Sequence, residues 1–161
     1  MSITKTEDRY LCFSLGEEQY AIPLLSVREV IAPPEITKVP QTPVHFLGIT
    51  NLRGQVISII DMRLKLSIKP GQTTETAVII CDLHPNSIGV IVDSINSVIS
   101  PTAEEISDKP ELQGQKNTEY IQSVMRINGK LILLLDISKT LNVGDQQLIS
   151  KTTDKANLKA A

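Results

Sequence analysis

The sequence predicts an all-β protein, because of its aliphatic composition, its short apolar runs and its turn residues. Of the 161 residues, 21 are Ile and 11 are Val, whereas there are only three Tyr, two Phe and no Trp. β-Branched side chains favour strands. The apolar runs are short and separated by Gly, Pro and Asn, which is typical of antiparallel strands rather than of βαβ units. A chain of this length is expected to form one compact unit.

Eight segments are expected to be strands: 10–15, 19–22, 46–52, 55–60, 76–83, 87–92, 121–127 and 130–135. Asn128-Gly129, between two apolar runs, is the strongest hairpin signal in the chain. Arg53-Gly54 has the same position between 46–52 and 55–60, and Pro85-Asn86 offers a turn between 76–83 and 87–92.

The remaining segments give weaker signals. Pro23 suits a first helical position, and Leu24, Val27 and Ile31 would share one helical face, so 23–31 is read as an ambiguous, helix-compatible segment. A helical turn is expected at 103–106, and polar loops at 67–75 and 100–119. Residues 1–9 and 144–161 are expected to be polar tails, with at most one helical turn near Leu148.

The chain also repeats itself weakly. Residues 51–66 align with 126–141 at an offset of 75, and 20–31 align with 88–99 at an offset of 68. Two matches in the same order predict two similar halves, with a boundary near 67–76. We interpret them as two small β-barrels in one compact unit. In each copy the hairpin ends in an Asp, Asp61 or Asp136, which is expected to cap the short helical piece that follows.

Catalytic and metal-binding motifs are missing from the sequence. His45 and His84 are both expected to be surface residues, and Cys12 and Cys81 to be reduced core residues. A net charge of −2 and few aromatic residues disfavour nucleic-acid binding. The N-terminus does not resemble a signal peptide, and no apolar run approaches the length of a bilayer span. We therefore expect a cytoplasmic protein without catalysis, cofactor, metal or small-molecule substrate.

An interaction surface remains as the expected function. Residues 56–60, 90–92 and 131–135 are apolar on both faces of their strands, so the second face must be covered by the other barrel or by a partner. Gly54 is explained by the positive φ of a tight turn. Arg53 has no such structural reason and is predicted to contact a partner, whereas Arg28 and Glu29 are expected to point into solvent by default.

The motifs resemble those of the CheW-type chemotaxis coupling family. The resemblance lies in Gly-Ile-Thr-Asn-Leu-Arg-Gly at 48–54, Phe-Ser-Leu-Gly-Glu-Glu-Gln-Tyr-Ala-Ile-Pro at 13–23, Ile-Gly-Val-Ile-Val-Asp at 88–93 and Thr-Ala-Glu-Glu-Ile at 102–106. It covers about residues 10–142. Ser58 stands where relatives often carry proline, and Gln41 where many carry a small residue or Asn.

The resemblance implies two intertwined five-stranded SH3-like barrels and a non-catalytic adaptor. Such an adaptor joins the helical cytoplasmic tips of chemoreceptors to the regulatory domain of the histidine kinase CheA, and is recruited to membrane receptor arrays without inserting into the membrane. An array with another output, such as surface motility or second-messenger control, is the alternative. The residues implied to bind partners are Arg53, Gly54, Val27, Glu29, Asn51 and Leu52, together with Val92, Ile95 and Val98 of the second barrel.

Overall fold

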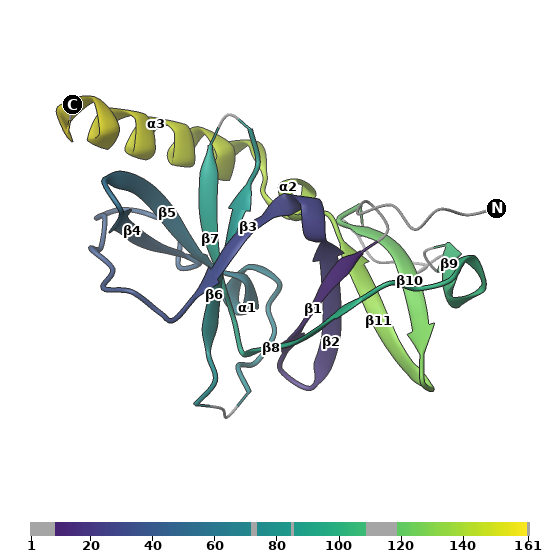
Figure 1. Ribbon diagram of the computed structural model, residues 1–161. Coiled ribbons are helices and arrows are strands. Elements are labelled where there is room, and N and C mark those ends of the chain that lie inside the picture. The colour runs from purple at the N-terminus through teal and green to yellow at the C-terminus, as the bar shows by residue number, and fades with distance from the viewer. Residues whose placement is uncertain (1–8, 72–73, 85, 109–118, 161) are drawn as a thin grey trace.

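Two β-sheets form the body of the computed structural model, which describes residues 9–71, 74–84, 86–108 and 119–160 (Figure 1). The six-stranded sheet has the order β8-β1-β2-β11-β10-β9, and the five-stranded sheet the order β3-β6-β7-β5-β4. The strands are β1 (Tyr10–Leu15), β2 (Glu18–Pro23), β3 (Val27–Ile31), β4 (Phe46–Leu52), β5 (Gln55–Asp61), β6 (Ala77–Asp82), β7 (Ser87–Val92), β8 (Ser94–Ile99), β9 (Ile106–Asp108), β10 (Ile121–Ile127) and β11 (Lys130–Leu135); the helices are α1 (Met62–Lys65), α2 (Ile137–Thr140) and α3 (Val143–Ala160).

The all-β prediction is confirmed, and all eight predicted strands are present with ends that differ by at most one residue. Sequence patterns missed β3, β8 and β9. The expectation of purely antiparallel strands is wrong at two places, because β2 pairs with β11 and β5 with β7 in parallel. The expected tail at 1–8 and the part of the expected loop at 109–118 lie outside the described residues.

The helix-compatible reading of 23–31 is wrong beyond its first turn. Pro23 ends β2, only Leu24–Ser26 form a 3₁₀ turn, and β3 begins at Val27. Alternation decides this segment, since the side chains of β3 are in turn partly buried and exposed, as in a strand with one covered face. The 3₁₀ turn predicted near 103–106 is confirmed at Ala103–Glu105, where Thr102 and Glu105 form a capping box.

The repeat explains the parallel pairs. The first half contains β1 to β5 and α1, and the second contains β6 to β11 and α2. Each half gives strands to both sheets: β1 and β2 join the sheet of β8 to β11, whereas β6 and β7 join the sheet of β3 to β5. The segment at 67–76 therefore separates two intertwined sequence halves, and it does not separate the two sheets.

Asp61 and Asp136 accept from the amides of Arg63 and Ser138, which confirms both helix caps.

The core has three parts, and these account for the strands that are apolar on both faces. One cluster packs within the five-stranded sheet and includes Ile57, Ile59 and Ile80. A second packs within the six-stranded sheet and includes Cys12, Met125 and Ile132. The largest lies between the sheets and combines side chains from β1, β2, β5, β6, β7 and β11. Packing of one sheet on the other thus covers most of the second faces. Cys12 and Cys81 are buried free thiols, as expected.

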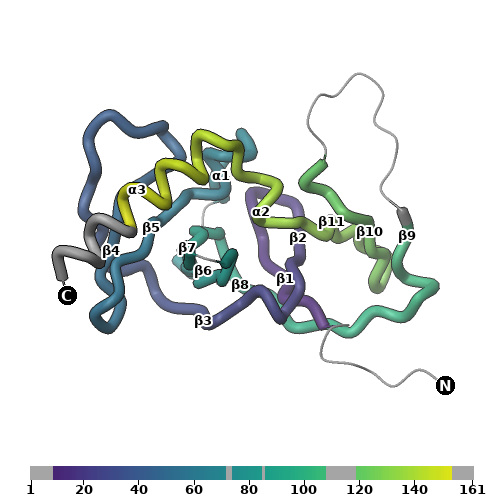
Figure 2. The backbone as a smooth tube through the Cα atoms, turned by 90° about the horizontal axis from the view of Figure 1, so that it is seen from above, coloured from purple at the N-terminus to yellow at the C-terminus, as the bar shows by residue number. Residues whose placement is uncertain are grey.

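Helix α3 corrects the prediction of a polar C-terminal tail. It begins at Val143, runs to Ala160, and lies over β5 and away from the six-stranded sheet (Figures 1 and 2). At its start, Asn142 and Asp145 exchange bonds between backbone amide and side chain, the pattern of a capping box. Sequence patterns missed the helix because most of its side chains are polar.

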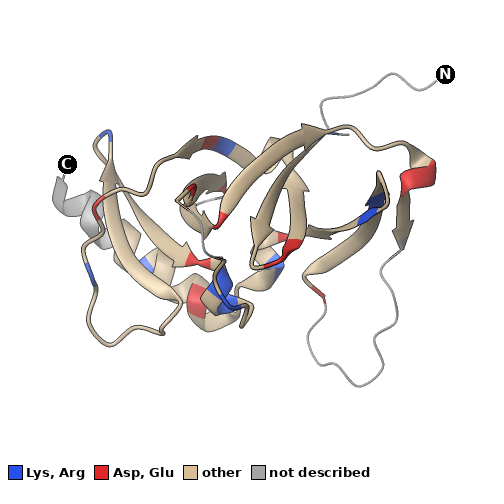
Figure 3. Ribbon diagram, turned by 90° about the horizontal axis from the view of Figure 1, so that it is seen from below, with Lys and Arg blue, Asp and Glu red and all other residues tan. Residues whose placement is uncertain are grey.

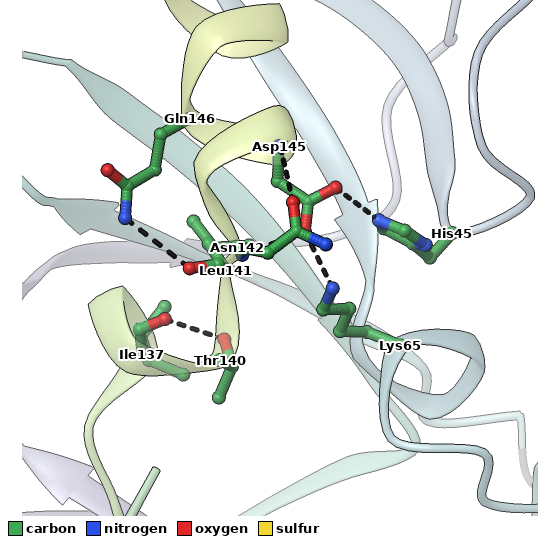
Figure 4. Close-up of polar contacts among 8 residues, drawn as sticks. All are labelled: His45, Lys65, Ile137, Thr140, Leu141, Asn142, Asp145 and Gln146. Atoms are coloured by element: carbon green, nitrogen blue, oxygen red, sulfur yellow. Dashed lines mark hydrogen bonds and ion pairs between the residues drawn. The ribbon is translucent and has the colours of Figure 1, made fainter. Parts of the chain in front are cut away.

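A polar cluster attaches the start of α3 to the five-stranded sheet (Figure 4). Asp145 is buried and accepts from Lys65 Nζ at 2.6 Å, and it lies 2.7 Å from His45 Nε2. His45 is therefore not the simple surface residue that the sequence suggested, because it contacts a buried carboxylate. No sequence pattern indicates this contact, since the two residues are 100 positions apart. Burial favours a higher pKa for Asp145, but the bonds from Lys65 and His45 outweigh it and hold that pKa below its ordinary value.

A second polar cluster joins the two sequence halves. Arg63 donates to both oxygens of Asp61 at 3.0 Å and to Asp93 at 2.8 Å. The other oxygen of Asp93 accepts from the amides of Gly16 and Gly71. Burial favours a higher pKa for Asp93, but the bonds from Arg63 and the two amides hold it below the ordinary range. This cluster fixes the point where the chain passes from β7 into β8.

Candidate partner-binding site

The β4–β5 hairpin ends in a two-residue turn with an unusual residue in it. Leu52 pairs with Gln55, and the two residues between them have positive φ, 51° at Arg53 and 88° at Gly54. Asn128 and Gly129 repeat this conformation at the β10–β11 turn, with φ of 53° and 78°. Asn and Gly are the usual residues of such a turn, whereas a long side chain in the left-handed region is disfavoured. Arg53 is therefore held where the backbone does not favour it.

Asn51 and Gly54 shape this turn. The amide of Gly54 donates to Asn51 Oδ1 at 2.8 Å, across the turn. A Cβ on Gly54 would meet no atom within 4 Å, so its backbone conformation and not crowding requires glycine there. Of the predicted site residues, these two position the tip, and Arg53 projects from it.

Arg53 has a partner within the chain. Its Nη2 lies 2.5 Å from Glu29 Oε1 on β3, with 65% of the arginine side chain and 27% of the glutamate side chain exposed. The structure thus brings together two residues that the sequence placed 24 positions apart. It corrects the expectation that Glu29 is simply solvated. An ion pair this exposed adds about 0.2–1 kcal/mol to stability, so it gives Arg53 little structural importance.

Arg28 is the residue that sequence reasoning missed. It was expected to point into solvent, but it donates to Gln55 Oε1, to Asp82 Oδ1 and to Ser87 Oγ, at 3.0, 2.6 and 2.7 Å. The Ser87 hydroxyl, and then Arg28, hold the pKa of Asp82 below its ordinary value. These bonds attach β3 to the base of the β4–β5 turn, and so they place Glu29 within reach of Arg53. No local sequence signal identifies these partners, because they lie 27 to 59 positions away in the chain.

Two further predicted residues, Val27 and Leu52, pack against the hydrophobic core near the tip. Val27 is partly buried against the core between the sheets, and Leu52 packs on the cluster inside the five-stranded sheet. Both positions are thus mainly structural, with part of each side chain accessible.

The three residues predicted from the second barrel behave differently from one another. Val92 is fully buried, so its proposed place on a partner-facing surface is wrong. The reason is that β7 lies between β6 and β5 and is covered on both faces. Ile95 is partly buried against the core. Val98 is 49% exposed on the edge strand β8, and its counterpart in the repeat, Val30 on the edge strand β3, is 42% exposed.

Charges of both signs are spread over the face of the molecule shown in Figure 3. Within the described residues, no group of three or more His, Cys, Asp or Glu side chains is placed to hold a metal ion. No helix of the described residues has both the length and the apolar character needed to cross a membrane.

Comparisons with known proteins found a matching family model, similar sequences and a similar solved structure. A family model described as "CheW-like domain" matches residues 9–144. The chemotaxis protein CheW of Klebsiella aerogenes is 34% identical over 141 residues, covering 87% of this chain and 85% of the relative. The chemotaxis protein CheW of Bacillus subtilis is 30% identical, with 89% and 92% covered. The crystal structure of the scaffolding protein TtCheW from Thermoanaerobacter tengcongensis superposes with a TM-score of 0.73 at 31% identity, covering 80% of this chain and 88% of that one.

Proposed function

Because this chain belongs to the family of CheW-like proteins, non-catalytic chemotaxis adaptors that couple receptors to the kinase CheA, we propose that its coupling site is the β4–β5 tip together with β3. The observation that carries the proposal is the conformation of Arg53. Its backbone has φ of 51°, which disfavours arginine, while its side chain remains 65% exposed. A strained position that adds little to stability is typical of a functional residue.

The partner at this site is the helical cytoplasmic tip of a chemoreceptor. Glu29 holds the Arg53 guanidinium in one orientation, and the fork of an arginine has donors left for a carboxylate or a carbonyl on the receptor helix. Val30 on β3 and Val98 on β8 are exposed and offer apolar contacts at the two sheet edges, although the side chain of Val30 points to the opposite face of β3 from that of Glu29. Helices bind such surfaces through apolar anchors with a charged rim.

The regulatory domain of CheA binds at a second surface, an edge strand of one of the two sheets. The edges are β8 and β9 in one sheet and β3 and β4 in the other, and β3 already belongs to the proposed receptor site. Unpaired groups along an edge are natural templates for another sheet. With separate sites for receptor and kinase, kinase activity depends on how the adaptor positions the two, and the coupling is one of binding free energies. Such an adaptor works in the cytoplasm, at membrane receptor arrays.

The test is Arg53→Glu in a reconstituted mixture of receptor, kinase and adaptor, with Asn128→Glu as the matched control. Both variants place a glutamate at the first position of the same kind of turn, so they strain the backbone similarly. We expect receptor-dependent kinase activation to be lost with Arg53→Glu and kept with Asn128→Glu. Unchanged activation by Arg53→Glu, with an unchanged circular dichroism spectrum, would exclude the tip as the coupling site.

A further inference from the structure

Helix α3 runs along the β5 strand toward the proposed site. Asp145 lies at the end of β5, beside Lys65 and His45, and Thr153 lies beside Ser58 in the middle of the strand. The helix is therefore antiparallel to β5, and the eight residues from 145 to 153 span about 12 Å. Ser58 is three residues from Gln55 at the start of β5, so Thr153 lies nearer the β4–β5 tip than Asp145 does.

The buried side of α3 combines polar side chains with two apolar ones, Leu148 and Ile149. Three side chains spaced four residues apart are buried, Asp145, Ile149 and Thr153, and we call them the docking stripe. Only Ile149 among them is apolar. Ser58 Oγ lies 3.2 Å from Thr153 Oγ1, and Asn86 donates to Ser150 Oγ at 3.0 Å. A pocket of about 180 Å³ lies between α3, α2 and the β6–β7 turn.

Polar contacts of this kind make docking specific and reversible. The hydroxyl pair and the Asp145 bonds can form only when the helix is in one register on β5. After release, water can solvate Ser58, Lys65 and His45. The apolar contact that is lost is that of Ile149, which belongs to the core between the sheets, and of Leu148, which packs against this core.

We propose that α3 is a detachable helix whose docking on β5 limits the motion of the β4–β5 hairpin and of the Arg53 tip. Strand β5 is held on its two edges by β4 and β7, and α3 covers the face that carries Ser58. Release of α3 removes that cover from β5, the strand that follows the turn, and thus lowers the local stability of the hairpin. A factor that binds free α3 would then change the tip without touching it. The proposal concerns the free protein and does not depend on the coupling function.

The experiment is hydrogen–deuterium exchange of the full chain in three variants. Thr153→Asp places a charge in the docking stripe and should release α3. Gln147→Asp adds the same charge on the exposed side of the helix and is the matched control. Ser58→Val with Thr153→Val replaces the hydroxyl pair by an apolar pair, which should tighten docking.

With Thr153→Asp we expect exchange at least about tenfold faster both in α3 and in residues 46–61, with the β10–β11 hairpin unchanged. The double valine variant should slow exchange in residues 46–61, and Gln147→Asp should match the wild type. Faster exchange of α3 without any change in 46–61 would overturn the proposal, as would an α3 that stays protected in Thr153→Asp. If Thr153→Asp unfolds the whole chain, the β10–β11 hairpin will report it, and the double valine variant decides: no slowing in 46–61 contradicts the proposal.

Discussion

Replacement of Arg53 by Asn separates the fold of the tip from its function. The substitution gives the β4–β5 turn the residue that the β10–β11 turn already has at Asn128. A non-glycine residue at positive φ costs about 1–2 kcal/mol, and Asn recovers part of this because its side chain tolerates the left-handed region. The lost Arg53–Glu29 pair is exposed, and it removes about 0.2–1 kcal/mol. The two effects nearly cancel, so the free energy of unfolding should rise by about 0–1 kcal/mol.

Urea unfolding followed by circular dichroism measures this change, and the denaturant slope should stay constant if the fold is the same. The expected shift in melting temperature is no more than about 4 °C upward. Receptor-dependent kinase activation should be lost in the same variant. Destabilisation by more than about 2 kcal/mol would show that Arg53 is structural, which refutes the reasoning from turn strain. The reciprocal change, Asn128→Arg, loses the part of this cost that Asn recovers, so it should lower stability by about 1 kcal/mol and leave activation intact.

Three other predictions concern the fold. Asp93→Asn leaves Arg63 with a lost charge partner and should lower stability by about 3 kcal/mol, or about 6–12 °C in melting temperature; a loss below about 1 kcal/mol would contradict the assigned cluster. The pKa values of Asp93 and Asp145 lie below the ordinary 3.8. The stability that these carboxylates add is therefore complete above about pH 4 and is lost as the pH falls through their lower folded pKa values. Unfolding titrations from pH 7 to 2 should show this loss of stability, and the loss should be smaller in Asp145→Asn. Burial raises the pKa of Cys12 to about 11 and of Cys81 to about 12, so neither thiol should react with an aromatic disulfide reagent at pH 8 until the chain unfolds; rapid labelling of the native protein would contradict this.

Much of the fold could be predicted because its signals are local. Short apolar runs, turn residues and the aliphatic composition located eight strands, and the two Asp caps followed from their position after each hairpin. The parallel pairs could not be predicted, since they depend on the exchange of strands between the two halves. Residues 23–31 were ambiguous because Leu24, Val27 and Ile31 would share one helical face, whereas pairing with β6 makes Val27–Ile31 a strand.

The candidate site was predicted in part. The tip Arg53-Gly54 could be found because Asn128 occupies the equivalent place in the repeat, so arginine is not required by the turn. The bonds of Arg28 and Glu29 could not be predicted, because they join residues 24 to 59 positions apart across the curved sheet. Val92 was misplaced because its position in a strand covered on both faces follows only from the strand order. Helix α3 was missed because a docking stripe with two polar residues gives no amphipathic signal.

The central claim is that a partner binds the positively charged side chain of Arg53. Exchange of the charges of Arg53 and Glu29 tests this claim most directly. In the variant with Arg53→Glu and Glu29→Arg the pair can form again with reversed sign, so stability should return to within about 0.5 kcal/mol of the wild type. Binding of the adaptor to an isolated receptor-tip fragment, measured by calorimetry, should still be weakened at least about tenfold, equal to about 1.4 kcal/mol. Wild-type affinity in the exchanged variant would contradict the claim, because it would show that the pair matters only for the structure of the tip.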